Sequence, residues 1–127
     1  MEAYDEARDR VGLLDADGQA AYASKCGAGI FAGPCSRFDA LYTLGMCSRC
    51  LTFPTERMMK AIERCIVYMA QTCDRGIKFD NKSSLVYEAY SDADWQVAHS
   101  TTGTCHCIGG RVVHASSKRQ QSISIST

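Results

Sequence analysis

The hydrophobic pattern of the chain changes its period near Gly76, and this change limits the folds that the chain can adopt. Before Gly76, apolar residues recur at the spacing of an amphipathic helix. After it, Ile77 and Phe79 alternate with charged residues, as in a half-buried strand. Helices that precede strands, without alternating with them, are typical of the α+β class. The sequence therefore predicts an α+β chain with a helical half and a β half.

The helical half is predicted to hold two helices. One is expected over 38–51, and the other begins with Pro54 in its first turn, where the missing N–H of proline costs nothing. The second helix should end near Cys73 and carries one apolar stripe that is expected to pack on a core: Met58, Ile62, Cys65, Ile66 and Met69. Residues 1–20 lack clear periodicity and are predicted to be a poorly ordered lead-in, so the helical segment is assigned to 21–76.

The β half, 77–127, is predicted to form an antiparallel three-stranded β-meander. The alternating stretch 77–80 reads as a short strand ahead of the meander, and the three strands of the meander are expected over 85–90, 102–108 and 111–116. Gly109-Gly110 is a strong signal for a two-residue hairpin turn, because both residues tolerate a positive φ. The last two strands are therefore expected to be hairpin partners.

The charges of the chain are unevenly distributed. Its 127 residues have a formal net charge of zero, which excludes neither a nucleic-acid nor a protein partner. No acidic residue follows Asp94, whereas Arg111, Lys118 and Arg119 are basic and are candidate nucleic-acid contacts. No apolar run reaches transmembrane length, and the acidic first residues are unlike a signal peptide. We therefore expect an intracellular location, in the cytoplasm or nucleus, and no membrane partner.

The eight cysteines raise the alternative of a small cysteine-rich metal-binding module. Cys47-x-x-Cys50 and Cys105-His106-Cys107 are spaced like ligand pairs for zinc. Zinc ligand pairs usually lie on tight turns, whereas these pairs fall inside a predicted helix and a predicted strand. Free thiols that are buried or idle are the simpler interpretation.

Two blocks of residues resemble copia-type retrotransposon Pol polyproteins. The first resembles the segment that follows the reverse transcriptase palm and comprises 35–42, Leu44-Gly45, Ser48-Arg49, 53–55, Lys60-Ala61, Arg64, Tyr68 and 74–77. The second is similar to the opening of the family's ribonuclease H domain and comprises 90–95, 100–103, Gly109-Gly110 and 116–120. Phe38 and Met58-Met59 depart from the family's usual residues. The resemblance covers roughly 20–127, and it implies the end of a reverse transcriptase followed by an incomplete ribonuclease H-like fold.

The resemblance also implies a function for the parent polyprotein. Such a protein copies RNA into DNA and hydrolyses the RNA strand of RNA–DNA hybrids with two Mg²⁺ ions. Its partners would be the hybrid and the remaining polymerase and ribonuclease H regions. A non-enzymatic remnant that binds nucleic acid through its basic end is a further alternative.

Asp92 matches the catalytic, Mg²⁺-binding aspartate on the first strand of the family's ribonuclease H. Its other interpretation is an exposed strand-end acid that caps the following turn. Asp94 belongs to the same motif and is a second candidate, although a loop-stabilising role suits it as well. Glu88 lies on the same side of the strand, but about four residues of extended chain place it more than about 12 Å away. One carboxylate cannot hold two dications, so the chain is predicted to be inactive alone.

The remaining polar and aromatic candidates carry no catalytic pattern. His99, His106 and His114 suit neither a nucleophilic triad nor a zinc-hydrolase site and are expected on the surface. Trp95 could stack on a base, but packing under the loop that follows Asp92 is the commoner role for such a residue.

Overall fold

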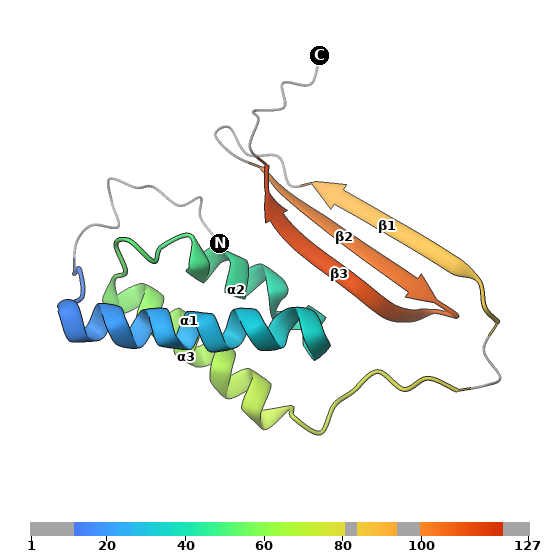
Figure 1. The fold of residues 1–127 in the computed structure, drawn as a ribbon, viewed down its shortest axis with the longest axis horizontal. Helices are drawn as coiled ribbons and strands as arrows, with labels where there is room; N and C mark the ends of the chain where they lie inside the picture. Colours follow the sequence, from blue (N-terminus) through green and yellow to red (C-terminus); the bar gives the residue numbers. More distant parts are fainter. Residues whose placement is uncertain (1–11, 81–83, 94–99, 121–127) are drawn as a thin grey trace, which may run out of the picture. The chain divides into compact units, whose positions relative to one another are not determined.

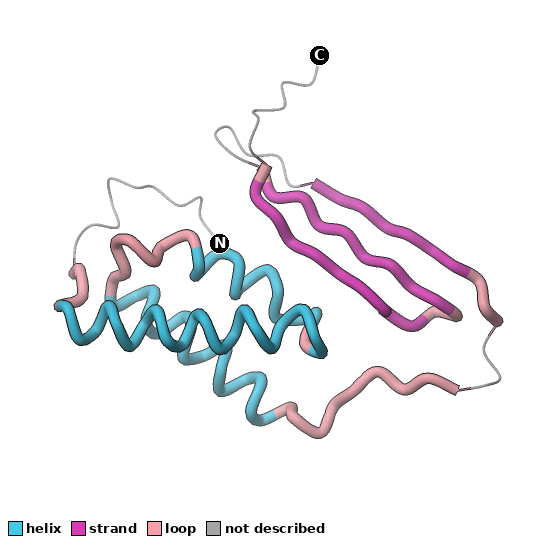
Figure 2. The backbone as a smooth tube through the Cα atoms, viewed as in Figure 1, coloured by secondary structure: helices cyan, strands magenta, loops and turns pink. Residues whose placement is uncertain are grey.

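The structure is a computed structural model that describes residues 12–80, 84–93 and 100–120. It divides into two compact units, Met1–Asp74 and Arg75–Thr127. The first unit contains the helices and the second contains an antiparallel sheet, as Figures 1 and 2 show. The predicted α+β class, with helices followed by a three-stranded sheet, is therefore confirmed, and it is consistent with part of a ribonuclease H-like fold. Within the described ranges, no helix is both long enough and apolar enough to cross a membrane.

Helix α1, Ala16–Ser36, is the element that the sequence analysis did not predict. It begins after Asp15, whose carboxylate accepts a hydrogen bond from the backbone N–H of Gly18 at 2.8 Å. This N-cap satisfies one of the amide groups that the first turn leaves without a helical partner. Residues 16–20 are consequently helical, and the expectation of an unordered lead-in is corrected for them.

Two further helices complete the first unit. A 3₁₀ turn, Phe38–Ala40, leads into α2, Leu41–Ser48, and α3 spans Glu56–Gln71. Both predicted helices therefore exist, but each is shorter than expected. Pro54 was placed wrongly in the first turn of α3, since it precedes the N-cap residue Thr55. Its carbonyl instead accepts a hydrogen bond from the N–H of Leu14 at 3.0 Å, which joins the segment before α1 to the segment before α3.

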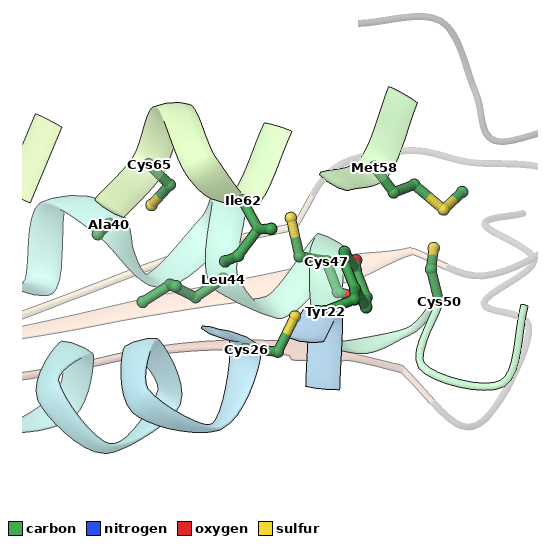
Figure 3. Packing of buried hydrophobic residues seen from close by; sticks show 9 residues of the cluster. All are labelled: Tyr22, Cys26, Ala40, Leu44, Cys47, Cys50, Met58, Ile62 and Cys65. Atoms are coloured by element: carbon green, nitrogen blue, oxygen red, sulfur yellow. The ribbon is translucent and has the colours of Figure 1, made fainter. Parts of the chain in front are cut away.

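The core of the helical unit lies between the three helices, as Figure 3 shows at close range. Tyr22 and Ile62 are completely buried, and the Tyr22 hydroxyl donates to the Cys47 carbonyl at 2.7 Å. The predicted stripe of α3 is confirmed, because Met58, Ile62 and Cys65 are buried while Ile66 and Met69 pack against them. Nine buried residues form this core: Tyr22, Cys26, Ala40, Leu44, Cys47, Cys50, Met58, Ile62 and Cys65.

Two glycines allow α1 and α2 to approach each other closely. A Cβ atom at Gly33 would lie 2.9 Å from Leu44 Cδ1, and one at Gly29 would overlap Leu44 Cδ2. The Leu44 side chain is itself buried, so it has little room to move away. The small residues of α1 therefore have a packing role.

Arg37 joins the end of α1 to the end of α3. Its guanidinium donates two hydrogen bonds to the carboxylate of Asp39, one to the Met69 carbonyl at 2.8 Å and one to the Thr72 hydroxyl at 2.7 Å. It also lies over the ring of Tyr68, 5.1 Å from the centroid, and the Tyr68 hydroxyl donates to Asp39. The hydrogen bonds from Arg37 hold the pKa of Asp39 at about 2, below its usual value.

This network predicts a pH dependence that Arg37→Gln should weaken. A carboxyl with a depressed pKa in the folded state adds stability above its unfolded pKa, and this stability is lost as the pH falls towards the folded value. For Asp39 the loss should fall between about pH 4 and about pH 2. We expect the unfolding free energy from urea titrations to fall less steeply over this window in the variant. Lys60→Gln, which removes a charge at an exposed position of α3, is the matched control. If the unfolding free energy depended equally on pH in the two variants, the stabilisation of the Asp39 carboxylate by Arg37 would be contradicted.

The second unit is a three-stranded antiparallel sheet in the order β1-β2-β3. Its strands are β1, Tyr87–Ala93; β2, Thr101–Ile108; and β3, Arg111–Arg119. Gly109 and Gly110 have φ values of 58° and 72°, so the predicted hairpin turn between β2 and β3 is confirmed. A register shift interrupts the β2–β3 ladder between His106 and Cys107.

The predicted strand over 77–80 is wrong. These residues have no regular secondary structure, and the side chains of Ile77 and Phe79 are exposed. Arg111 contacts the segment instead, because its Nε donates to the Lys78 carbonyl at 2.8 Å and its guanidinium pairs with Asp80 at 3.8 Å. Apolar and charged residues therefore alternate over 77–80 although this segment is not a strand.

Candidate functional site

Asp92 lies one residue before the end of β1 and is exposed. Its ladder partner on β2 is Gly103, which has no side chain to cover the carboxylate. The Oδ1 atom accepts a hydrogen bond from the N–H of Ala93 at 2.8 Å. This contact is the one expected of a strand-end acid, and the exposed carboxylate can also accept a metal ion from solvent. The local structure therefore accommodates both interpretations of Asp92.

The described residues do not form a complete metal centre at Asp92. Over 12–80, 84–93 and 100–120, no group of three or more His, Cys, Asp or Glu side chains could hold a metal ion. Glu88 lies four residues earlier on the same face of β1, and it accepts a hydrogen bond from the Tyr90 hydroxyl at 3.2 Å. That hydrogen bond raises the pKa of Tyr90. Asp94, Trp95 and His99 lie outside the described ranges.

The three basic candidates are divided between the two ends of the sheet. Lys118 pairs with Thr102 and Arg119 with Thr101, at the end of the ladder where Ala93 pairs with Thr102. Both basic side chains are exposed there. Arg111 pairs with Ile108 beside the hairpin turn, at the opposite end. The structure thus brings Lys118 and Arg119, but not Arg111, to the end of the sheet that carries Asp92.

The cysteines of the two candidate zinc pairs belong to different units. Cys47 and Cys50 are buried in the helical core, whereas Cys105 and Cys107 lie on β2 with their sulfur atoms 3.9 Å apart. All eight cysteines are free thiols. Burial raises the pKa of the Cys47 thiol to about 11. Because zinc binds the thiolate, this burial opposes a zinc site at Cys47.

The burial of the thiols predicts their order of reaction. Cys35 and Cys73 are exposed, so iodoacetamide at mildly alkaline pH should modify them first. Cys26 and Cys47 should react only after denaturant unfolds the helical unit, because burial raises the pKa of both thiols. Peptide mass spectrometry over a time course measures the order. Rapid modification of Cys26 or Cys47 in the native chain would contradict the packing described above.

Comparison with known proteins places the chain beside transposon polyproteins. It is 33% identical over 92 residues to each of two proteins from Arabidopsis thaliana, the retrovirus-related Pol polyproteins from transposons RE1 and RE2, which covers 69% of this chain. It is also 27% identical over 110 residues to the secreted RxLR effector protein 161 of Plasmopara viticola, covering 84% of this chain and 78% of that protein. No protein-family model and no solved structure matches the chain.

These similarities support a retrotransposon Pol polyprotein as the relative of this chain. The chain spans only 6% of the length of the RE1 and RE2 polyproteins. The similarity therefore concerns a short part of such a polyprotein, and the activities of the whole polyprotein do not transfer to this chain by similarity alone.

One group of side chains at the sheet was not found from the sequence. Tyr87, His106 and His114 form a row of rings across β1, β2 and β3. The histidines were expected on the surface: His114 is exposed and His106 is half-buried, and their closeness was not predicted. Their proximity depends on the register shift between His106 and Cys107, because the uninterrupted register set by the Gly109-Gly110 turn would pair His106 with Val113.

Proposed function

We propose that the chain is part of a copia-type reverse transcriptase and ribonuclease H polyprotein. In this proposal, 21–76 form the end of the reverse transcriptase and 77–127 form the first part of the ribonuclease H domain. The parent polyprotein copies RNA into DNA and hydrolyses the RNA strand of RNA–DNA hybrids, in the cytoplasm or nucleus. The observation that carries the proposal is Asp92, an exposed carboxylate beside the end of the first strand of a three-stranded meander. The similarity to the RE1 and RE2 polyproteins supports it.

The role proposed for Asp92 is that of one Mg²⁺ ligand. Mg²⁺ prefers carboxylate, water and phosphate oxygens, and two such ions can activate the attacking water and stabilise the leaving oxygen of a phosphodiester. The described residues supply one carboxylate at this position, which does not complete such a centre. Asp94, two residues later in the same motif, is a further candidate. The other acidic ligands would come from the remaining ribonuclease H region of the polyprotein.

Lys118 and Arg119 are proposed to contact the phosphates of the hybrid. Both are exposed at the same end of the sheet as Asp92; Arg119 shares the face of Asp92, whereas Lys118 points to the opposite face. Arg111 is the weakest of the three candidates, because it lies at the other end and contacts Lys78 and Asp80. A non-enzymatic nucleic-acid-binding remnant would use the same two basic residues, so activity distinguishes the two functions.

The test joins this chain to the part of the RE1 polyprotein that follows the matched segment, which in this proposal completes the ribonuclease H domain. We expect the joined protein to cleave the RNA of an RNA–DNA hybrid in the presence of Mg²⁺ and to leave single-stranded RNA intact. Gel analysis of end-labelled RNA measures both reactions. A folded joined protein that binds the hybrid but does not cleave it would favour the non-enzymatic function over the proposal.

A further inference from the structure

The face of the sheet opposite Asp92 carries two histidines side by side. His106 on β2 and His114 on β3 are direct ladder partners, and their ring centroids lie 5.6 Å apart. Successive residues of a strand point to opposite faces, so these rings share a face with Tyr87 and not with Asp92 or Cys105. The His114 ring is exposed and the His106 ring is half-buried. A solute therefore has access to both imidazoles.

Tyr87 orients one of these rings. Its hydroxyl lies 2.6 Å from Nδ1 of His106, and the two rings are stacked at 27° with their centroids 6.0 Å apart. In the tautomer that carries its proton on Nδ1, His106 donates to the phenol oxygen and keeps the lone pair of Nε2. Histidines that bind metals are commonly oriented in this way, by a hydrogen bond from the ring nitrogen that does not bind the metal to a neighbouring polar group.

The spacing of the two rings suits a bridging metal ion. An ion bound about 2.1 Å from one nitrogen of each ring, at a tetrahedral angle, places the ring centroids about 5 Å apart. The observed centroid separation of 5.6 Å is close to this value. We propose that His106 and His114 together bind one divalent late transition-metal ion of the class of Zn²⁺, Co²⁺ and Ni²⁺, with water at the remaining positions and with Tyr87 as the orienting residue.

This site is distinct from the Mg²⁺ position proposed at Asp92. Imidazole nitrogen suits zinc, nickel and copper, whereas Mg²⁺ prefers oxygen. The two ladders fix the backbone positions of His106 and His114, so little ordering is needed on binding. The next ladder pair on the same face is Thr104 and Ser116, about 7 Å along the strands. Their hydroxyls bond each other at 2.8 Å and give this face further polar groups for metal-bound water.

A titration of the full chain with Co²⁺, under reducing conditions, tests the site. We expect saturable binding of one ion, with visible absorption of nitrogen and oxygen ligation and without the intense near-ultraviolet bands of thiolate ligation. His106→Gln and His114→Gln should each weaken binding at least about tenfold, and Tyr87→Phe should weaken it about tenfold, by the usual effect of removing an orienting group. The double variant Cys105→Ser, Cys107→Ser, on the opposite face, is the matched control and should bind as the parent does.

Several results would overturn the inference. Unchanged affinity in either histidine variant would remove the site, and thiolate bands that vanish in the cysteine control would assign the ion to the sulfur atoms. Unchanged affinity in Tyr87→Phe would remove the orienting role. Circular dichroism checks that each variant is folded. In the parent chain, Co²⁺ should selectively broaden the imidazole proton resonances of His106 and His114, and an absence of broadening would equally contradict the proposal.

Discussion

Asp92→Asn, made in the protein that joins this chain to the part of the RE1 polyprotein that follows the matched segment, should reduce Mg²⁺-dependent cleavage of the hybrid by about a hundredfold or more. Asparagine keeps the size of the side chain and can still accept the hydrogen bond from Ala93, but it removes the negative charge that would hold the ion. Asp92 is exposed and belongs to no ion pair within 12–80, 84–93 and 100–120. The variant should therefore fold as the parent does, with a similar thermal midpoint.

Glu88→Gln is the matched control for this variant. Glu88 lies on the same strand and the same face, four residues earlier, so its carboxylate is too far from Asp92 to share a metal ion. We expect the cleavage rate to change by less than about twofold, the size of a surface charge effect. Initial rates at saturating Mg²⁺ measure both variants. Full activity in Asp92→Asn, or equal losses in both variants, would show that Asp92 has no special role.

Ile62→Ala should lower the unfolding free energy of the helical unit by about 2–5 kcal/mol. Ile62 is completely buried on α3, within the core cluster of the helical unit. Its truncation removes apolar contacts and leaves a cavity in the packed core. Small domains are stable by only about 5–15 kcal/mol, so a loss of this size is a large part of the total stability.

Val67→Ala provides the comparison on the same helix. The Val67 side chain is 51% exposed, and alanine is the better helix former, so we expect a change of less than about 0.5 kcal/mol. Urea unfolding followed by circular dichroism at 222 nm, a wavelength that reports helix content, measures both variants. Comparable losses in the two variants would mean that the stripe of α3 does not face the core as described.

The predicted and missed helices differ in one physical respect. The α3 stripe consists of large apolar side chains at helical spacing, and such a pattern identifies the buried face of a helix from its sequence alone. Helix α1 is rich in Ala, Gly and Ser and has no such stripe, because it packs by close backbone approach at Gly29 and Gly33. A local signal was present in Asp15, a good N-cap residue ahead of a run of small residues.

The β half shows what alternation alone can establish. Gly109-Gly110 predicted the hairpin correctly, because a two-residue turn with positive φ requires such residues. Ile77 and Phe79 also alternate with charged residues, yet they form no strand. A strand needs a hydrogen-bonded partner, and the periodicity of one segment carries no information about its partner.

The candidate residues were predictable to different degrees. The sequence motif identified Asp92, and the spacing along one extended strand separated Glu88 from it. The separation of Arg111 from Lys118 and Arg119, and the row that includes His106 and His114, depend on the pairing of three strands. Such relations require the register, which composition and motifs do not contain.

The most direct test of the account is the ribonuclease H activity of the purified chain by itself, with Mg²⁺ and with a metal chelator as the control. We propose that Asp92 is one ligand of a two-metal centre, and among the described residues no group of three or more His, Cys, Asp or Glu side chains could hold a metal ion. The purified chain is therefore expected to cleave the hybrid no faster than buffer does. Mg²⁺-dependent cleavage of the hybrid by this chain, sensitive to the chelator and copurifying with it, would contradict the account.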